Sequence, residues 1–182
     1  MEEKKYAVLI DGDNISSKYL DSILNEMTKY GIATYKRIYC DFTSQQSSKW
    51  RRLVRDSGIQ AMQQFANTVG KNATDSTLII DAMDILYTGN VDGFCIVSSD
   101  GDFTRLAIRL KESGMDVIGM GESKTPRSFR AACTVFTDLE ILYEAESEDD
   151  EISTKGKKPA VKHNVVKVSE IENVIIEIIN EN

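Results

Sequence analysis

Six short apolar runs alternate with segments of helical periodicity along the first 144 residues. The runs have the length and composition of β-strands; they are YAVLI, ATYKRIYC, IQAMQQF, GFCIVS, DVIGMG and TVFTDL. Between them, segments such as STLIIDAMDILY and TRLAIRLKESG place apolar residues on one helical face, and the second ends at Gly114, a typical helix terminator. Strict alternation of strands and helices predicts an α/β fold, a mostly parallel sheet with helices on both faces.

The length and composition limit the number of domains. A chain of 182 residues with 41% hydrophobic side chains supports one sizeable core. It contains no apolar stretch of membrane-spanning length, and its start, MEEKKY, does not resemble a secretory signal. We therefore expect a soluble cytoplasmic protein that does not contact a membrane. The widely spaced Cys40, Cys95 and Cys133 are predicted to be reduced core residues.

Charge divides the chain into three parts. Residues 1–137 hold 17 acidic and 17 basic residues, residues 138–151 hold eight acids and no base, and residues 152–168 hold five lysines and no acid. Such charged runs have too little apolar surface to offset the entropy of ordering. We predict one domain over residues 1–144, a flexible linker over 145–165 and an amphipathic helix over 166–182, in which Ser169 and Glu172 form a capping box before an isoleucine-rich stripe.

Acidic residues follow two of the predicted strands. Asp11 ends the first strand in VLIDGDN, Asp100 and Asp102 follow a later one in IVSSDGDF, and Asp75 stands near the start of a predicted helix. The carboxyl ends of parallel strands share one edge, where ligands gather. Clustered carboxylates repel one another, and a bound cation relieves that repulsion. An all-oxygen set suits Mg²⁺ or Mn²⁺.

Several of these acidic and amide residues also have structural interpretations. Asp75 alone could be a helix N-cap. Asp13 and Asn14 could form the turn after the first strand, with Asn14 holding the loop around Asp11. Asp81 and Asp84 lie on the polar side of their helix, which favours a solvated face.

Three segments resemble the NYN domains, the LabA-like branch of the PIN-like nucleases. They are VLIDGDN, KNATD with LIIDAMD in the following helix, and IVSSDGDFTRLAIRLKESGMDVIGMG, and the resemblance spans residues 4–143. It implies a Rossmann-like PIN fold and hydrolysis of RNA phosphodiester bonds with a divalent metal. KNATD departs from the glycine and valine that many members carry before the aspartate. The acids that match the family's catalytic metal ligands are Asp11, Asp75, Asp100 and Asp102, and the supporting residues are Asp13, Asn14 and Asp81.

Basic residues near this edge are candidates for phosphate contacts. Those in or beside loops near the predicted site are Lys71, Lys124, Arg127 and Arg130. The segment SSKWRRLVR surrounds Trp50 with cations, so a base could stack there, although Trp50 is better explained as packing its helix on the sheet.

Two other functions remain open from the sequence. The Asp11-Gly-Asp13 motif is similar to the opening motif of haloacid-dehalogenase-type phosphatases, in which the first aspartate attacks phosphorus. An RNA-binding module with an inactive nuclease site is the second. NYN domains are often followed by a winged-helix module of the OST-HTH (LOTUS) type, so the predicted helix over 166–182 could begin such a module or bind a partner protein.

Overall fold

Six parallel strands form one sheet that lies between two layers of helices. The computed structural model describes residues 3–45, 47–65 and 73–155. The strands are β1 (Lys5–Asp11), β2 (Ile32–Cys40), β3 (Gln60–Gln63), β4 (Gly93–Val97), β5 (Asp116–Gly121) and β6 (Val135–Asp138). Their order is β3-β2-β1-β4-β5-β6, and every pair is parallel. The predicted α/β fold is confirmed, and each of the six apolar runs overlaps one strand.

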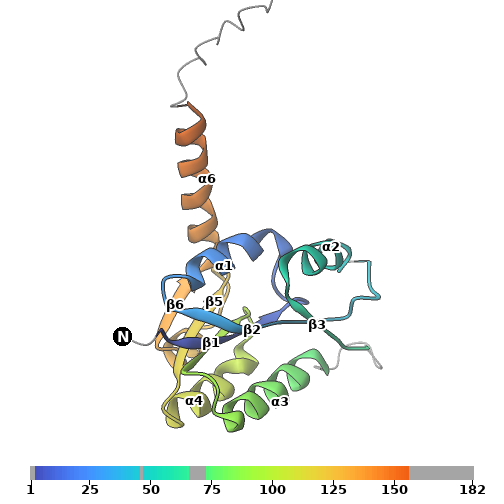
Figure 1. Cartoon of the computed structure of the whole chain (residues 1–182), viewed down its shortest axis with the longest axis vertical. Helices are drawn as coiled ribbons and strands as arrows, with labels where there is room; N and C mark the ends of the chain where they lie inside the picture. The colour runs from blue at the N-terminus through green and yellow to red at the C-terminus, as the bar shows by residue number, and fades with distance from the viewer. Residues whose placement is uncertain (1–2, 46, 66–72, 156–182) are drawn as a thin grey trace, which may run out of the picture. The chain divides into compact units, whose positions relative to one another are not determined.

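Helices cover both faces of this sheet. They are α1 (Leu20–Met27), α2 (Ser48–Ser57), α3 (Ala73–Thr88), α4 (Thr104–Glu112), α5 (Arg127–Ala132) and α6 (Leu139–Lys155), with short 3₁₀ helices η1 (Ser17–Tyr19) and η2 (Gly101–Phe103). Figure 1 shows α1 and α2 on one face, and α3 and α4 on the other. Alternate residues of β1 enter the two cores: Val8 and Ile10 pack with α1 and α2, whereas Ala7 and Leu9 pack with α3 and α4.

The acidic segment after β6 is helical in the structure. Helix α6 continues to Lys155, whereas the sequence predicts a linker from residue 145. Leu139 is buried in the first core and Leu142 packs against it, and the Ser22 hydroxyl donates to the Glu146 carboxylate. These contacts support the helix despite its charge, which alone suggested a linker.

The boundaries of the linker and of the C-terminal segment stay predictions. The first compact unit of the chain ends at Ser147 and contains the whole sheet. The predicted helix over 166–182 lies outside the described residues. Within the described part of the chain, none of the helices has both the length and the apolar character needed to cross a membrane.

Trp50 joins α2 to the loop that follows β1. The side chain is only 2% exposed, and its Nε1 donates a 3.0 Å hydrogen bond to the Gly12 carbonyl. Gly12 itself lies against β2, where an added Cβ would be 2.9 Å from Cδ1 of Ile38. Trp50 therefore packs its helix on the sheet, as favoured from the sequence, and fixes the peptide between Asp11 and Asp13.

We expect Trp50→Phe to lower the free energy of unfolding by about 1–3 kcal/mol, because the buried Gly12 carbonyl loses its donor. Urea unfolding followed by circular dichroism measures the change. Tyr87→Phe, at a side chain that is 73% exposed, is the control and should match the wild type. A Trp50→Phe protein as stable as this control would contradict the role assigned to the hydrogen bond.

Candidate metal centre

The acidic residues gather where the strand order reverses. β1 lies between β2 and β4, so the chain leaves β1 toward one side of the sheet and later returns on the other. Crevices at such switch points are the usual ligand sites of open α/β sheets. Asp11 is the last residue of β1, and Asp100 follows the end of β4 by three residues.

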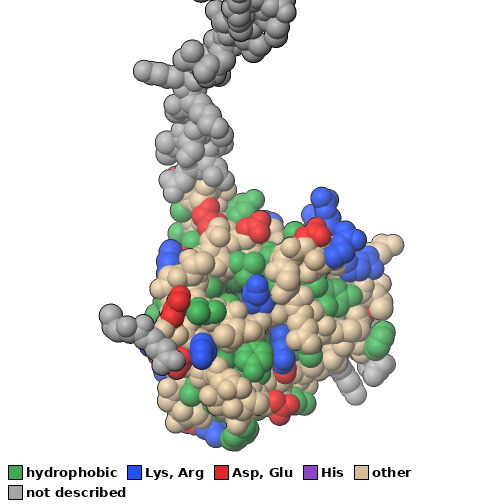
Figure 2. Space-filling view, viewed as in Figure 1, with side chains coloured by type: hydrophobic (Ala, Val, Ile, Leu, Met, Phe, Trp, Pro, Cys, Tyr) green, Lys and Arg blue, Asp and Glu red, His purple; other side chains and the backbone are tan. Residues whose placement is uncertain are grey.

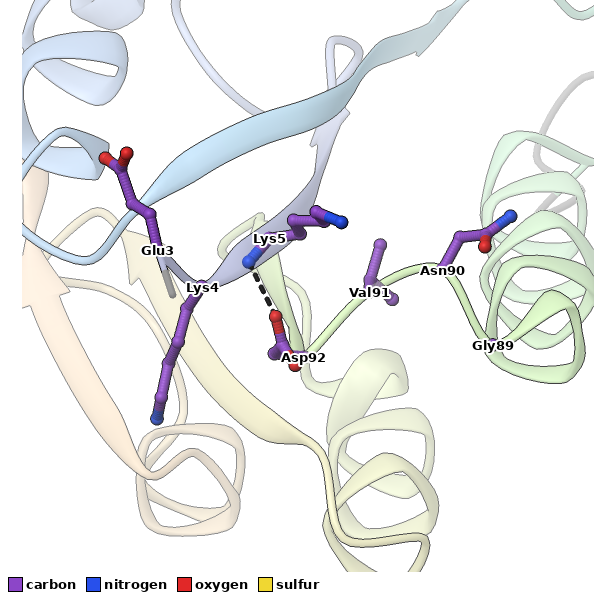
Figure 3. A pocket seen from close by; sticks show the side chains of 7 residues that line it. All are labelled: Glu3, Lys4, Lys5, Gly89, Asn90, Val91 and Asp92. Atoms are coloured by element: carbon purple, nitrogen blue, oxygen red, sulfur yellow. Dashed lines mark hydrogen bonds between the residues drawn. The ribbon is translucent and has the colours of Figure 1, made fainter. Parts of the chain in front are cut away.

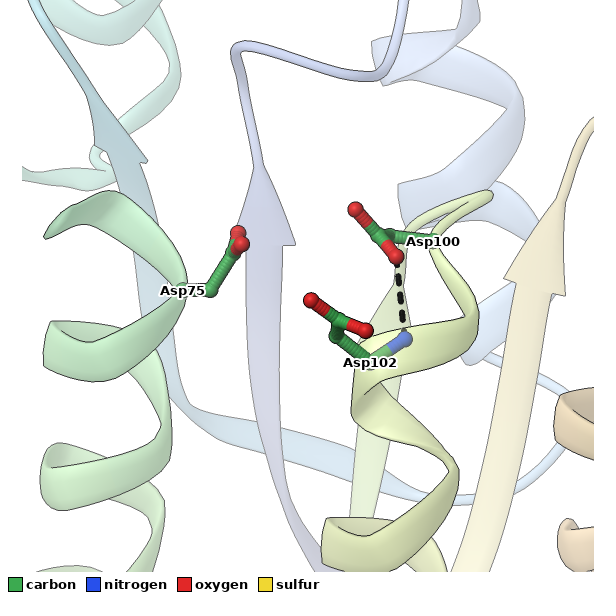
Figure 4. A group of neighbouring side chains, drawn as sticks. All are labelled: Asp75, Asp100 and Asp102. Atoms are coloured by element: carbon green, nitrogen blue, oxygen red, sulfur yellow. Dashed lines mark hydrogen bonds between the residues drawn. The ribbon is translucent and has the colours of Figure 1, made fainter. Parts of the chain in front are cut away.

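Three carboxylates lie close together at this edge. Asp75, Asp100 and Asp102 each offer a ligand oxygen, and these oxygens all lie within 4.8 Å of one another. Figure 4 shows Asp75 reaching from α3 toward Asp100 and Asp102 at η2. The Asp100 side chain also accepts a 2.9 Å hydrogen bond from the Asp102 backbone N–H, which caps η2. Asp75 lies within the first turn of α3 and does not precede it, so the N-cap interpretation does not apply.

Asp11 lies outside this close group of three. Its side chain has no exposed surface. Oδ2 accepts a 2.7 Å bond from the Ser98 hydroxyl and a 2.9 Å bond from Asn14 Nδ2, while Oδ1 accepts a longer one, 3.3 Å, from the Asn14 N–H. Burial raises the pKa of Asp11, whereas these hydrogen bonds favour its charged form and lower it. Asn14 thus holds the loop around Asp11, as one sequence interpretation proposed.

The pKa of Asp75 depends on the burial of its carboxyl group and on the negative charge around it. Its pKa is raised from 3.8 to about 6, first by burial and then by the charges of Asp11, Asp100, Asp102 and Asp13. Asp11 is the carboxylate with the largest effect, so it acts on Asp75 although it is not in the close group. A cation placed among these carboxylates would reverse the electrostatic cost.

The ligand set fits a hard divalent ion. All donors are carboxylate oxygens, as Mg²⁺ and Mn²⁺ prefer. Two oxygens bound to one Mg²⁺ lie at most about 4.2 Å apart, twice the usual metal–oxygen distance. Small side-chain rotations therefore suffice to bring Asp75, Asp100 and Asp102 onto a shared ion.

The predicted supporting acids have different surroundings. Asp13 is exposed, and its Oδ2 accepts a 2.8 Å bond from the Thr74 hydroxyl at the start of α3. Asp81 is neither solvated nor part of the close group: it pairs with the Arg37 guanidinium and accepts a hydrogen bond from the Tyr39 hydroxyl. Both partners lie on β2, so the sequence interpretations of Asp81 are corrected, and its carboxylate ties α3 to the sheet.

The predicted phosphate-binding residues also differ in their surroundings. Arg127 is exposed, and Lys124 is exposed with its Nζ 2.9 Å from Glu122. Arg130 has its guanidinium bonded to the carbonyls of Glu122, Ser123 and Thr125 and to the Asp138 carboxylate. These bonds shape the loop after β5, and a phosphate contact by Arg130 stays a prediction. Lys71 lies outside the described residues.

Ser98 is a site residue that the sequence analysis did not identify. Its hydroxyl donates to Asp11 and accepts a 3.0 Å hydrogen bond from the Asp100 N–H, so it joins the ends of β1 and β4. The side chain is fully buried. The available signal was a small polar residue directly after a buried strand, in IVSSD.

A hollow at the opposite edge of the sheet has a different character. It has a volume of about 220 Å³ and is lined by residues 3–5 and 89–92. Figure 3 shows Asp92 turned toward the β1 backbone, where it accepts a 2.7 Å bond from the Lys5 N–H. Two acidic and two basic residues line it, so this hollow lacks the concentrated negative charge of the carboxylate cluster.

Comparisons with known proteins agree with this architecture. The model of the NYN domain family matches residues 5–140, which confirms the resemblance seen in the sequence. An uncharacterized protein of Methanocaldococcus jannaschii, MJ0482, is 26% identical over 174 residues; the match covers 92% of this chain but only 66% of that relative. The crystal structure of VPA0982, a protein of unknown function from Vibrio parahaemolyticus, has a TM-score of 0.63 and 18% identity, covering 76% of this chain and 96% of that one. The last comparison shows a shared fold.

We expect Asp75→Asn to stabilise the metal-free protein at neutral pH by about 1–3 kcal/mol. The folded-state pKa of Asp75 lies above 3.8, so its ionisation destabilises the fold. That penalty is absent below pH 4, develops as the pH rises toward 6 and is complete above it. Thermal unfolding in EDTA at pH 4 and pH 7.5 measures this difference.

Asp84→Asn, on the exposed side of the same helix, is the matched control. It should leave the melting temperature nearly unchanged at both pH values. An Asp75→Asn protein that gains no stability at pH 7.5 would contradict the view that burial and the neighbouring charges disfavour the ionised Asp75 carboxylate.

Proposed function

Because the chain belongs to the NYN domain family, whose members are generally nuclease-like, we propose that it is a divalent-metal-dependent ribonuclease that hydrolyses RNA phosphodiester bonds. The observation that carries this proposal is the convergence of Asp75, Asp100 and Asp102 at the switch point of a parallel sheet. Site and family support the same chemistry independently.

Mg²⁺ or Mn²⁺ is the proposed cofactor. Asp75, Asp100 and Asp102 would hold it, and Asp11 would add a fourth negative charge from the end of β1. Such an ion supplies positive charge for the phosphate oxygens and acidifies water at neutral pH. The same acids are proposed as the catalytic residues.

The chain's own residues orient the reaction. Asp102 is the exposed member of the cluster, and its proposed role is to accept a hydrogen bond from the attacking water. Asn14 and Ser98 keep Asp11 in one rotamer, while Asp13 holds the loop against α3 through Thr74. Lys124 lies in the loop after β5 and Arg127 at the start of α5. Both side chains are exposed, and we propose that they bind phosphates.

The two alternative functions are less consistent with the site. A phosphatase of the haloacid-dehalogenase type needs an aspartate that reaches phosphorus, but Asp11 has no exposed surface and both of its oxygens accept hydrogen bonds. A module that only binds RNA gains nothing from carboxylates that repel phosphates. After burial, the charges of Asp11, Asp100, Asp102 and Asp13 also raise the pKa of Asp75, so negative charge is concentrated at this edge of the sheet.

The remaining organisation is also a proposal. We assign the nuclease to residues 1–144, and residues 166–182 to a helix that contacts a partner protein or begins a further RNA-binding module of the OST-HTH type. A cytoplasmic location, where RNA is abundant, is compatible with this assignment.

Asp100→Asn should reduce the rate of RNA cleavage by at least about 100-fold, because it removes a carboxylate at the proposed reaction centre. Asp11→Asn should act in the same direction. Cleavage of end-labelled RNA by the full chain measures the rate, with Asp84→Asn as the control. A folded Asp100→Asn protein that cleaves like the wild type would overturn the site assignment.

Removal of metal should abolish cleavage reversibly. After treatment with EDTA, Mg²⁺ or Mn²⁺ should restore the activity, because the ligands are hard oxygen donors. The melting temperature should also rise with added metal in the wild type, and less in Asp75→Asn. Full cleavage in excess EDTA would exclude the mechanism.

A further inference from the structure

A second cavity adjoins the carboxylates on the side facing α2. Its volume is about 530 Å³. The walls come from the loop after β1, the end of β2 with the start of α2, and Glu122 after β5. Asp13 and Asn14, which neighbour Asp11, form the wall nearest the metal centre. A strand bound with its phosphate at the metal centre would therefore meet this cavity next.

The lining suits a sugar–phosphate unit. It presents the hydroxyls of Ser16, Ser17 and Ser48, the amide of Gln45 and the ammonium of Lys49. Hydroxyl, amide and ammonium groups are the usual partners of phosphate and ribose oxygens.

The two acids of the lining do not oppose an anionic ligand strongly. Glu122 is paired with Lys124 at 2.9 Å. Asp13 accepts bonds from the Thr74 hydroxyl at 2.8 Å and from the Asp41 N–H at 3.4 Å. Lys49, in contrast, belongs to no ion pair among the described residues. The cavity therefore offers a cation for an incoming phosphate.

Helix α2 continues the positive surface beyond the cavity. Figure 2 shows Lys and Arg side chains gathered over α2, and the exposed ones are Lys49, Arg51, Arg52 and Arg55. Lys49 and Arg52 are three residues apart and share a face of the helix. Arg51 donates to the Phe42 carbonyl and Arg55 lies 3.5 Å from Asp56, so the first pair has its charge more freely available.

We propose that this cavity is a nucleotide subsite and that Lys49 and Arg52 bind the phosphates of the RNA strand that leaves the metal centre through it. This inference rests on the proposed ribonuclease function and adds the path of the substrate. The volume falls within the roughly 300–1,000 Å³ of pockets that enclose one small molecule. A cavity of this size suits one unpaired nucleotide, so we expect the strand to be single at this point.

The test measures RNA binding without cleavage, in full-length Asp100→Asn protein with Mg²⁺ and a labelled 12-nucleotide single-stranded RNA. Adding Lys49→Ala and Arg52→Ala should weaken binding by roughly tenfold and reduce the salt slope of log K by about 1.4, since each lost phosphate contact contributes about 0.7. The control pair Arg109→Ala and Lys111→Ala removes the same charge from the last turn of α4, at the opposite edge of the sheet. It should change neither quantity appreciably.

Ser48→Glu separates binding from stability. An acid in the first turn of α2 favours the helix through its dipole but repels a phosphate in the cavity. The variant should therefore be at least as stable as its parent and bind RNA more weakly. Asn90→Glu, on the exposed loop before β4, carries the same charge change as a control.

Trp50 provides a direct report of occupancy, because it lines the cavity and is the single tryptophan of the chain. RNA should change its fluorescence in the Asp100→Asn protein, and this change should diminish in Ser48→Glu. A duplex of the same length should compete poorly.

The outcomes separate the subsite from the ribonuclease proposal. If the Asp100→Asn protein binds RNA but the α2 variants keep its affinity and salt slope, or if saturating RNA leaves the Trp50 emission unchanged, the subsite is refuted and the ribonuclease proposal stands. If neither the wild type cleaves RNA nor the Asp100→Asn protein binds it, both proposals fall.

Discussion

The hydrogen-bonded burial of Asp11 is the constraint on which the site depends. A carboxylate without exposed surface at the end of the central strand is costly unless donors surround it. Asn14 and the Ser98 hydroxyl supply them, and Ser98 also accepts from the Asp100 N–H. Asp100 in turn caps η2 through the Asp102 N–H. One chain of hydrogen bonds thus places three acids from two strand ends.

This chain of bonds holds like charges together against their repulsion. The raised pKa of Asp75, caused first by burial and then by the neighbouring acids, includes this cost in the metal-free protein. The cost is tolerated because the acids stand on rigid elements: β1 and β4 are central strands buried on both faces, and α3 is anchored to β2 by Asp81 with Arg37. A site fixed in this way lowers the stability of the metal-free protein. In return, its acids need little rearrangement to bind a metal ion.

The sequence predicted the elements whose signals are local. Strands buried on both faces appear as continuous apolar runs, and acids at their ends mark the shared edge of a parallel sheet. Features that depend on a distant partner were missed. Periodicity gave the face on which Asp81 lies but not the β2 side chains that cover it. The charge of the segment after residue 145 did not reveal that helix α6 continues through it. The bonds of Arg130 to backbone carbonyls were also not foreseen, because no sequence pattern records such acceptors.

The acids and bases of residues 1–137 are equal in number but are not evenly distributed over the folded domain. Residues 1–137 carry equal numbers of acids and bases, but five of the acids, Asp11, Asp13, Asp75, Asp100 and Asp102, stand at one edge of the sheet. The rest of that domain is therefore left with more bases than acids. Part of this excess is the exposed run on α2, which adjoins the cavity beside the acids. The proposed RNA site therefore lies beside a carboxylate cluster that would repel a polyanion until a cation is bound, so under this proposal metal binding and RNA binding would be electrostatically coupled.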